Sequence, residues 1–169
     1  MSAELFRPVG LAKIGPAGTR IGVVATAEEC VALAARMGIP AVHALSCVFD
    51  LTPAKTDPGR IRAEGVLSGR VTRECVVSAE EFETPVSDHF VVFFVPEGAE
   101  NEDVDPDTED EILYRGDSID LGEAAAEQLA LSLDPYPRIE GAEMPEMEDD
   151  GESSPFAALA RSRRSGKLD

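Results

Sequence analysis

Apolar residues alternate with polar ones along two stretches of the chain, residues 42–52 and 60–78, and a third stretch, residues 86–95, is apolar on both faces at its end. In the first stretch the apolar side chains occupy every second position: Leu45, Cys47, Phe49 and Leu51. A period of two is typical of a β-strand with one buried face. Because only short, turn-rich segments separate the three stretches, the pattern predicts three long strands joined as an antiparallel meander.

Two other stretches have the period of a helix. Thr26 and Glu29 form the capping-box pattern that opens a helix, and apolar residues then recur at steps of three and four until Gly38. Asp120 and Glu123 repeat the capping-box pattern ahead of a second apolar stripe, which ends before a proline. These patterns predict two helices, which would pack on the sheet.

Acidic residues are concentrated in two segments. The chain of 169 residues contains 33 acidic and 15 basic residues, a formal net charge of −18. Residues 97–111 hold nine acids and no base, and residues 140–152 hold seven acids and no base. Such segments repel themselves and bury little apolar surface, so we expect both to be disordered. The predicted fold class is α+β: an antiparallel β-sheet of three or more long strands, two packed helices and disordered acidic segments.

These boundaries predict one main structural unit. We expect a single α+β domain over residues 1–138, interrupted by the acidic disordered insert 97–111. We expect residues 139–169 to form a flexible acidic tail that ends in a short helix and a basic end.

Several classes of function are disfavoured by what the chain lacks. Its longest apolar run, residues 90–95, is far shorter than the roughly 20 residues of a membrane span. It has no P-loop, no Gly-x-Gly-x-x-Gly, no Gly-x-Ser-x-Gly and no Cys-x-x-Cys. We therefore expect a cytoplasmic binding protein rather than an enzyme, with no catalytic residues, no cofactor, no metal site and no membrane or DNA partner.

Individual candidates for chemistry have plainer interpretations. Cys75 falls on the apolar face of the second strand stretch, which favours a buried structural thiol over a nucleophile. By alternation, His43 also falls on the apolar face of its strand.

Three stretches together resemble a known family. They are Arg-Glu-Cys-Val-Val-Ser at 73–78, the segment 119–138 that ends in Asp-Pro-Tyr-Pro-Arg, and Pro-Phe-Ala-Ala-Leu-Ala at 155–160. In order and spacing they resemble the YceD family, the large ribosomal RNA subunit accumulation proteins, in the form found in alphaproteobacteria. The resemblance implies a role in the synthesis, processing or stability of 23S rRNA, without established catalytic residues.

The chain departs from the family pattern at one motif. Many members carry Cys-x-x-Cys at the strand end, where this chain has Cys75 but Ser78 in place of the second cysteine. Any metal site proposed for those members is not carried over to this chain.

The first functional hypothesis is an assembly factor that binds a basic ribosomal protein, an assembly factor or the pre-ribosomal large subunit. Acidic segments attract basic partners by long-range steering, although both segments can equally act as solubilising linkers. The basic end is the natural place for rRNA contact, next to two apolar residues that could dock in a groove. The candidate partner-binding residues there are Phe156, Leu159, Arg161, Arg163 and Arg164.

The second hypothesis is direct rRNA binding through sheet arginines together with the basic C-terminus. Arg62 and Arg70 share the polar strand face, whereas Arg73 has the opposite parity. No aromatic residue is expected on that face to stack with bases. An enzyme such as a nuclease would need the acids of the insert, and no metal cluster can be assigned to them.

Tyr136 and Arg138 complete the partner-binding candidates. Prolines on both sides of Tyr136 predict a rigid, extended exit from the second helix. The structural interpretation has Tyr136 packing on the sheet, and the functional alternative makes Tyr136 and Arg138 an exposed docking pair.

Overall fold

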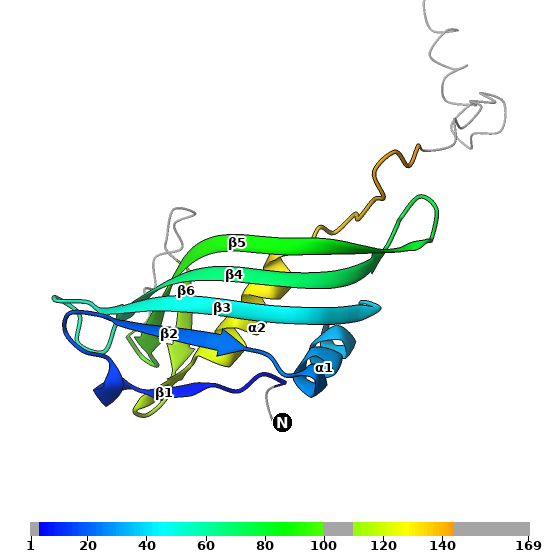
Figure 1. The fold of residues 1–169 in the computed structure, drawn as a ribbon. Coiled ribbons are helices and arrows are strands. Elements are labelled where there is room, and N and C mark those ends of the chain that lie inside the picture. The colour runs from blue at the N-terminus through cyan, green and yellow to red at the C-terminus, as the bar shows by residue number, and fades with distance from the viewer. Residues whose placement is uncertain (1–3, 100–109, 144–169) are drawn as a thin grey trace, which may run out of the picture.

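The computed structural model describes residues 4–99 and 110–143 (Figure 1). Its long elements are the strands β3 (Ala41–Pro53), β4 (Ile61–Glu74) and β5 (Glu81–Pro96) and the helices α1 (Ala27–Met37) and α2 (Leu121–Ser132). The short elements are β1 (Pro8–Gly10), the 3-10 turn Leu11–Lys13, β2 (Thr19–Val24), β6 (Glu111–Tyr114) and β7 (Ser118–Asp120).

Five strands form the central sheet in the order β2-β3-β4-β5-β6. All neighbours are antiparallel except β5 and β6, which run parallel. The predicted meander is therefore confirmed as β3, β4 and β5. Strands β4 and β5 pair from Ile61 opposite Phe94 to Glu74 opposite Glu81, which makes a long hairpin.

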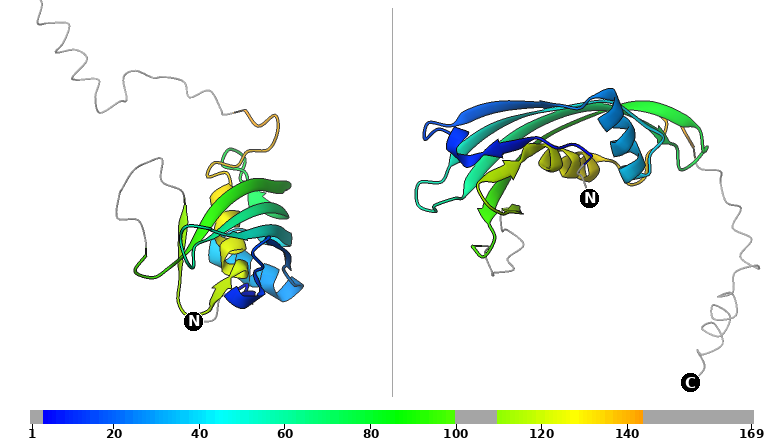
Figure 2. Two further views of the ribbon diagram at one scale, coloured as in Figure 1. Left: turned by 90° about the vertical axis from the view of Figure 1, so that its left-hand side faces the viewer. Right: turned by 90° about the horizontal axis from the view of Figure 1, so that it is seen from below.

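Both helices lie on one face of the sheet, and the opposite face is open (Figure 2). A second sheet of two strands, β1 and β7, lies on the helix side and joins the N-terminal segment to the start of α2. The α+β class is confirmed.

The core lies between the sheet and the helices. The alternating residues of β3 that the sequence placed on one face are buried: Leu45, Cys47, Phe49 and Leu51. The rings of Phe49 and Phe90 meet edge to face, with centroids 5.8 Å apart. Phe90 lies over Gly65, where a side chain of any size would overlap the ring. Gly65 is therefore a point of close packing in the sheet.

The prediction for His43 is wrong. The register between β3 and β4 shifts between Val42 and Ala44, so Val42 takes the buried position and His43 is exposed. Its Nε2 atom lies 2.7 Å from the hydroxyl of Thr72. A β-bulge moves every residue beyond it to the opposite face of the sheet. The alternation of apolar and polar residues in the sequence does not reveal where such a bulge lies.

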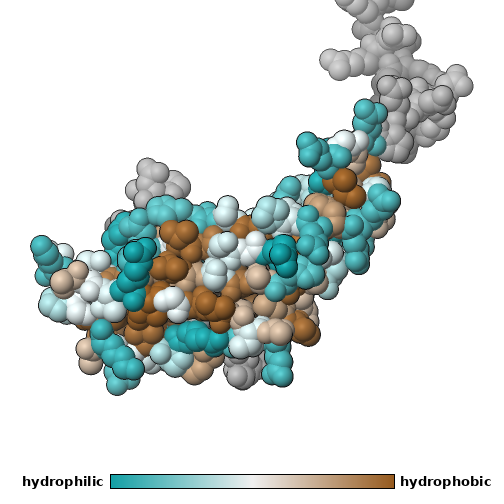
Figure 3. All heavy atoms as spheres, viewed as in Figure 1, coloured by the Kyte–Doolittle hydropathy of each residue, from teal (hydrophilic) through white to brown (hydrophobic). Residues whose placement is uncertain are grey.

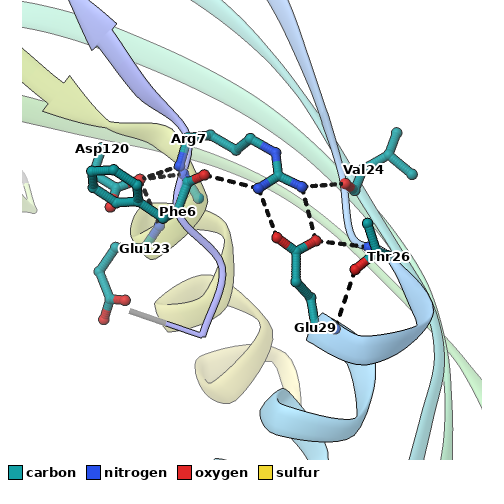
Figure 4. Close-up of polar contacts among 8 residues, drawn as sticks. Phe6, Arg7, Val24, Thr26, Glu29, Asp120 and Glu123 are labelled. Atoms are coloured by element: carbon teal, nitrogen blue, oxygen red, sulfur yellow. Dashed lines mark hydrogen bonds and ion pairs between the residues drawn. The ribbon is translucent and has the colours of Figure 1, made fainter. Parts of the chain in front are cut away.

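Arg7 links the N-terminal segment to both helices (Figure 4). Its guanidinium donates to both carboxylate oxygens of Glu29, at 2.7 and 2.8 Å, and to the carbonyl of Val24. Its backbone N–H donates to Asp120, the residue that caps α2. Glu29 also accepts from the N–H of Thr26, which confirms the predicted capping box of α1.

The side chain of Glu123 does not repeat the predicted capping box. Both of its carboxylate oxygens accept from Arg36 of α1, at 3.0 and 2.6 Å. The Glu123 carboxylate in the first turn of α2 thus binds Arg36 in the last turn of α1 and not a backbone N–H at its own helix end. A charged guanidinium is a stronger hydrogen-bond donor to a carboxylate than a neutral backbone N–H.

The described ends of the acidic insert are ordered. Glu97 donates its N–H to the carbonyl of Tyr114, and Phe93 donates to the carbonyl of Asp110. Glu111 begins β6 and forms an ion pair with Arg60. The ordered chain therefore extends into both ends of the segment 97–111, and the rest of that insert lies outside the described residues.

Candidate binding site

After α2 the chain crosses back over the end of the β4–β5 hairpin as an irregular segment, residues 134–139, which we call the strap. Three hydrogen bonds hold it. Arg73 donates to the carbonyl of Asp134, Val76 donates to the carbonyl of Pro137, both at 2.9 Å, and Ile139 donates its N–H to the sulfur of Cys75 at 3.4 Å. The strap is thus fixed to the turn that joins β4 to β5.

Cys75 is buried, with 1% of its surface exposed, as its place on the apolar face predicted. The N–H of Ile139, followed by the side chain and N–H of Ser78, hydrogen-bonds to the sulfur and lowers the pKa of Cys75 to about 7. Cys75 and Ser78 therefore lie together at one turn, against the strap. In residues 4–99 and 110–143 no three histidine, cysteine, aspartate or glutamate side chains are placed to share a metal ion.

Tyr136 does not pack on the sheet, so the structural interpretation of this side chain is wrong. It is 70% exposed, whereas Pro137 beside it is buried. The carbonyl of Pro137 is held by Val76, which turns the preceding residue outward. Arg138 is exposed as well. Both candidate residues of the strap are therefore accessible to a partner.

Arg138 borders a cavity of about 280 Å³ between the hairpin, the end of α2 and the strap. We call it the arginine cavity, because Arg73 and Arg138 both line it. The rest of the lining combines an aromatic ring, hydroxyl groups and one acid: Phe82, Thr84, Pro85, Val86, Ser87, Ser132, Leu133, Asp134 and Pro137. This cavity is open to small polar groups.

A second cavity, of about 380 Å³, lies on the other side of the strap. Its lining is more apolar and includes Ile39, Val76 and Pro135. Arg73 lines both cavities, and Pro137 of the strap lines both as well.

Arginines on the open sheet face are paired with acids. Arg62 lies 2.9 Å from Glu64, Arg70 lies 3.5 Å from Glu83, and Arg20 lies 3.5 Å from Asp50. Apolar residues lie between these charged groups, among them Val24, Val48 and Val66 (Figure 3). Arg73 faces the helix side instead, as its parity predicted, because it pairs in register with Phe82 of the arginine cavity.

The open face does carry an aromatic residue, contrary to expectation. Phe93 pairs in register with Arg62, so the two side chains share the open face. The guanidinium of Arg60 covers the ring at 4.5 Å from its centroid. The sequence of β5 is apolar on both faces at its end, which indicated that one of its aromatic residues would lie on the open face. The guanidinium of Arg60 already stacks on the Phe93 ring, so this ring is not available to a base.

The remaining candidates, Phe156, Leu159, Arg161, Arg163 and Arg164, lie outside the described residues. Sequence reasoning missed the arginine cavity, because its lining comes from β4, β5, α2 and the strap. Two residues of its lining were singled out in advance, Arg138 as a partner-binding candidate and Arg73 as a sheet arginine of opposite parity.

Comparisons with known proteins identify the family. A family model described as large ribosomal RNA subunit accumulation protein YceD matches residues 63–161, a range that includes β4 from its third residue, β5, α2 and the strap. No curated protein and no solved structure gives a significant match. None of the described helices is long and apolar enough to cross a membrane. Because the family match covers more than half of the chain, this protein belongs to the YceD family of large ribosomal RNA subunit accumulation proteins.

Proposed function

We propose that this chain is a non-enzymatic factor in large ribosomal subunit biogenesis. It supports the synthesis, processing or stability of 23S rRNA by binding a basic ribosomal protein or an assembly intermediate in the cytoplasm. The family's name ties its members to accumulation of the large-subunit rRNA. The proposal adds the mode of action, which is binding rather than catalysis.

The observation that carries the binding mode is the distribution of charge. The protein has a net charge of −18, and the arginines of its open sheet face are held by carboxylates. Each RNA phosphate contact needs a free lysine or arginine, so this surface is a poor general clamp for RNA. An acidic protein attracts basic partners by long-range steering, and ribosomal proteins are typically basic.

The alternative is direct rRNA binding through the sheet-face arginines and the basic C-terminus. The ion pairs Arg62–Glu64 and Arg70–Glu83 weigh against the sheet, because binding a phosphate there would require breaking them. Arg161, Arg163 and Arg164 remain candidates for such contact.

We also propose that residues 1–138 form the domain, with the strap reaching one residue further to Ile139, and that residues 139–169 act as an acidic tail with a basic end. In this arrangement the insert and the tail attract the partner, and Tyr136 and Arg138 form part of the docking surface.

The test is sedimentation of the tagged full chain from its native lysate on sucrose gradients, with and without RNase. We expect it to migrate with a large-subunit precursor, and to remain on a ribosomal protein after RNase treatment. A chain that stays at the top of the gradient would contradict the proposal, and loss of all association after RNase would favour direct rRNA binding.

A matched pair of variants tests the role of charge. One changes the six acids of residues 100–109 to the corresponding amides. The other makes the same change at six exposed acids of the folded domain that form no ion pair among the described residues: Glu28, Asp57, Glu74, Glu80, Glu81 and Asp117. We expect only the first to lose most of its association with the precursor. Equal association of both variants would show that the insert does not attract the partner.

A further inference from the structure

Two arginines differ from all others in the described chain. Of the nine arginines in residues 4–99 and 110–143, seven form ion pairs with carboxylates: Arg7, Arg20, Arg36, Arg60, Arg62, Arg70 and Arg115. Within these ranges Arg73 and Arg138 form no ion pair, and both line the arginine cavity. In a protein where acids outnumber bases by 33 to 15, two arginines without a carboxylate partner at one cavity mark a place for an outside anion.

We propose that the arginine cavity binds a phosphate group of single-stranded RNA. This proposal rests on the part of the proposed function that brings the chain to precursors of the large subunit, and it adds one RNA contact at a place other than the sheet-face arginines. A guanidinium presents its N–H donors as a planar fork that matches two oxygens of a phosphate.

The donors come from rigid parts of the fold. Arg73 lies on β4 in register with Phe82, and it gives one of its five N–H groups to the carbonyl of Asp134. The other N–H groups of Arg73 remain for a ligand. Arg138 is carried by the strap, which Val76 and Cys75 hold in place on either side of it. Both guanidinium groups belong to the lining of one cavity, Arg73 from β4 and Arg138 from the strap.

The one acid in the lining, Asp134, forms no ion pair with either arginine among the described residues. Its carboxylate accepts the N–H of Tyr136 at 2.9 Å. Ser132 and Thr84 add hydroxyl groups to the lining, although the hydroxyl of Ser132 also donates to Asp88.

Aromatic side chains beside the cavity favour RNA over an acidic peptide. Phe82 lines the cavity, and Tyr136 stands exposed on the same strap as Arg138. Unpaired bases stack on such rings while the phosphate is held by arginine, which is the usual way proteins bind single-stranded RNA. Because each arginine would neutralise one phosphate, binding at this cavity is expected to weaken as the salt concentration rises.

The test measures binding of a short, fluorescently labelled oligouridine to the purified full chain by anisotropy over a range of salt concentrations. The variants are Arg138→Gln, Arg73→Gln and Arg73→Lys. The matched control is Arg20→Gln, which removes the same charge from an exposed arginine at the far edge of the sheet. Arg138→Gln breaks no hydrogen bond among the described residues, so it is expected to fold normally.

We expect Arg138→Gln and Arg73→Gln each to weaken RNA binding about tenfold, as the loss of a charged hydrogen bond predicts. Each should also lower the slope of log affinity against log salt by about 0.7, the value for one phosphate contact on a single strand. Arg20→Gln should bind like the unaltered protein, and Arg73→Lys should retain more affinity than Arg73→Gln.

Three results would overturn the proposal: no RNA binding by the unaltered protein, equal binding by Arg138→Gln and Arg20→Gln, or binding of a polyglutamate peptide in place of RNA. A further experiment adds inorganic phosphate in place of RNA. If it shifts the side-chain NMR signal of Arg138 while RNA does not bind, the cavity takes a free anion only. Sedimentation of the unaltered chain with ribosomal precursors is scored separately, so failure of the cavity and failure of the proposed function are distinguishable.

Discussion

At the scale of single residues, the sheet depends on a glycine beneath an aromatic ring. A methyl group at Gly65 would lie 2.6 Å from Cε1 of Phe90, whose ring is already fixed against Phe49. Gly65→Ala is therefore expected to lower the free energy of unfolding by about 1 to 3 kcal/mol, the usual cost of overpacking a core. Urea denaturation followed by circular dichroism measures it.

The control for this prediction is Gly22→Ala. Gly22 lies on the edge strand β2, and a methyl group there would meet nothing within 4 Å. Its unfolding free energy should stay the same or rise slightly, because alanine has less backbone entropy to lose. Equal losses in both variants would show that the contact with Phe90 does not decide the effect.

At the scale of elements, the Arg7–Glu29 pair joins the N-terminal segment, β2 and α1. The hydrogen bonds from Arg7, and then from the Thr26 N–H, lower the pKa of Glu29 from 4.5 to about 2. A carboxyl whose pKa is lower in the folded state stabilises the fold above pH 4.5, and this contribution is lost as the pH falls toward 2.

Glu29→Gln is therefore expected to lower the free energy of unfolding at pH 7 by about 1 to 3 kcal/mol, as for hydrogen bonds to a charged group. The difference from the unaltered protein should shrink between pH 4.5 and 2. Glu28→Gln, an exposed neighbour in the same helical turn, is the control and should change little. A difference that persists unchanged at pH 2 would contradict the assignment.

The elements themselves could be predicted well from the sequence. Strands β3, β4 and β5 each bury one face, so burial imposes the period of two that the sequence shows. Both helices carry their caps in the sequence, at Thr26 and Asp120. The bulge at His43 could not be predicted, because the local pattern is the same with and without it.

The candidate site could be predicted only in part. Alternation correctly separated Arg73 from Arg62 and Arg70. The two prolines marked the exit from α2, but this exit bends at Pro135 and Tyr136 and is not extended there. The return of that segment to the end of β4 is a tertiary contact, made by Val76 and Cys75, and no local periodicity encodes it. The exposure of Tyr136 and the position of the arginine cavity are therefore determined by tertiary packing and not by a local sequence pattern.

At the scale of the whole molecule, the described core and the strap that covers one end of it are built from residues of the range 4–143. The strap supplies three hydrogen bonds to β4 and the turn after it, and the last described turn is Ala142 to Ile139. A fragment of residues 1–143 is expected to unfold at the same temperature as the full chain. A fragment of residues 1–133, which lacks the strap, should lose about 2 to 4 kcal/mol, since each bond contributes about 1 kcal/mol.

Thermal unfolding followed by circular dichroism compares the two fragments with the full chain. A clear loss of stability in residues 1–143 would mean that the tail contributes to the fold and that the proposed domain boundary is misplaced. Equal stability of both fragments would show that the strap is only loosely held.

The pairing of β1 with β7 also delays the completion of folding during synthesis, because the two strands are translated far apart in time. Arg7 and its partner Asp120 are 113 positions apart, and the buried Leu5 packs in the same region. At 5 to 20 residues per second, the amino-terminal strand waits about 6 to 23 seconds before its partner has been translated. During that interval Leu5 and Val9 have no completed core to enter, so the nascent chain finishes folding only when most of it has left the ribosome.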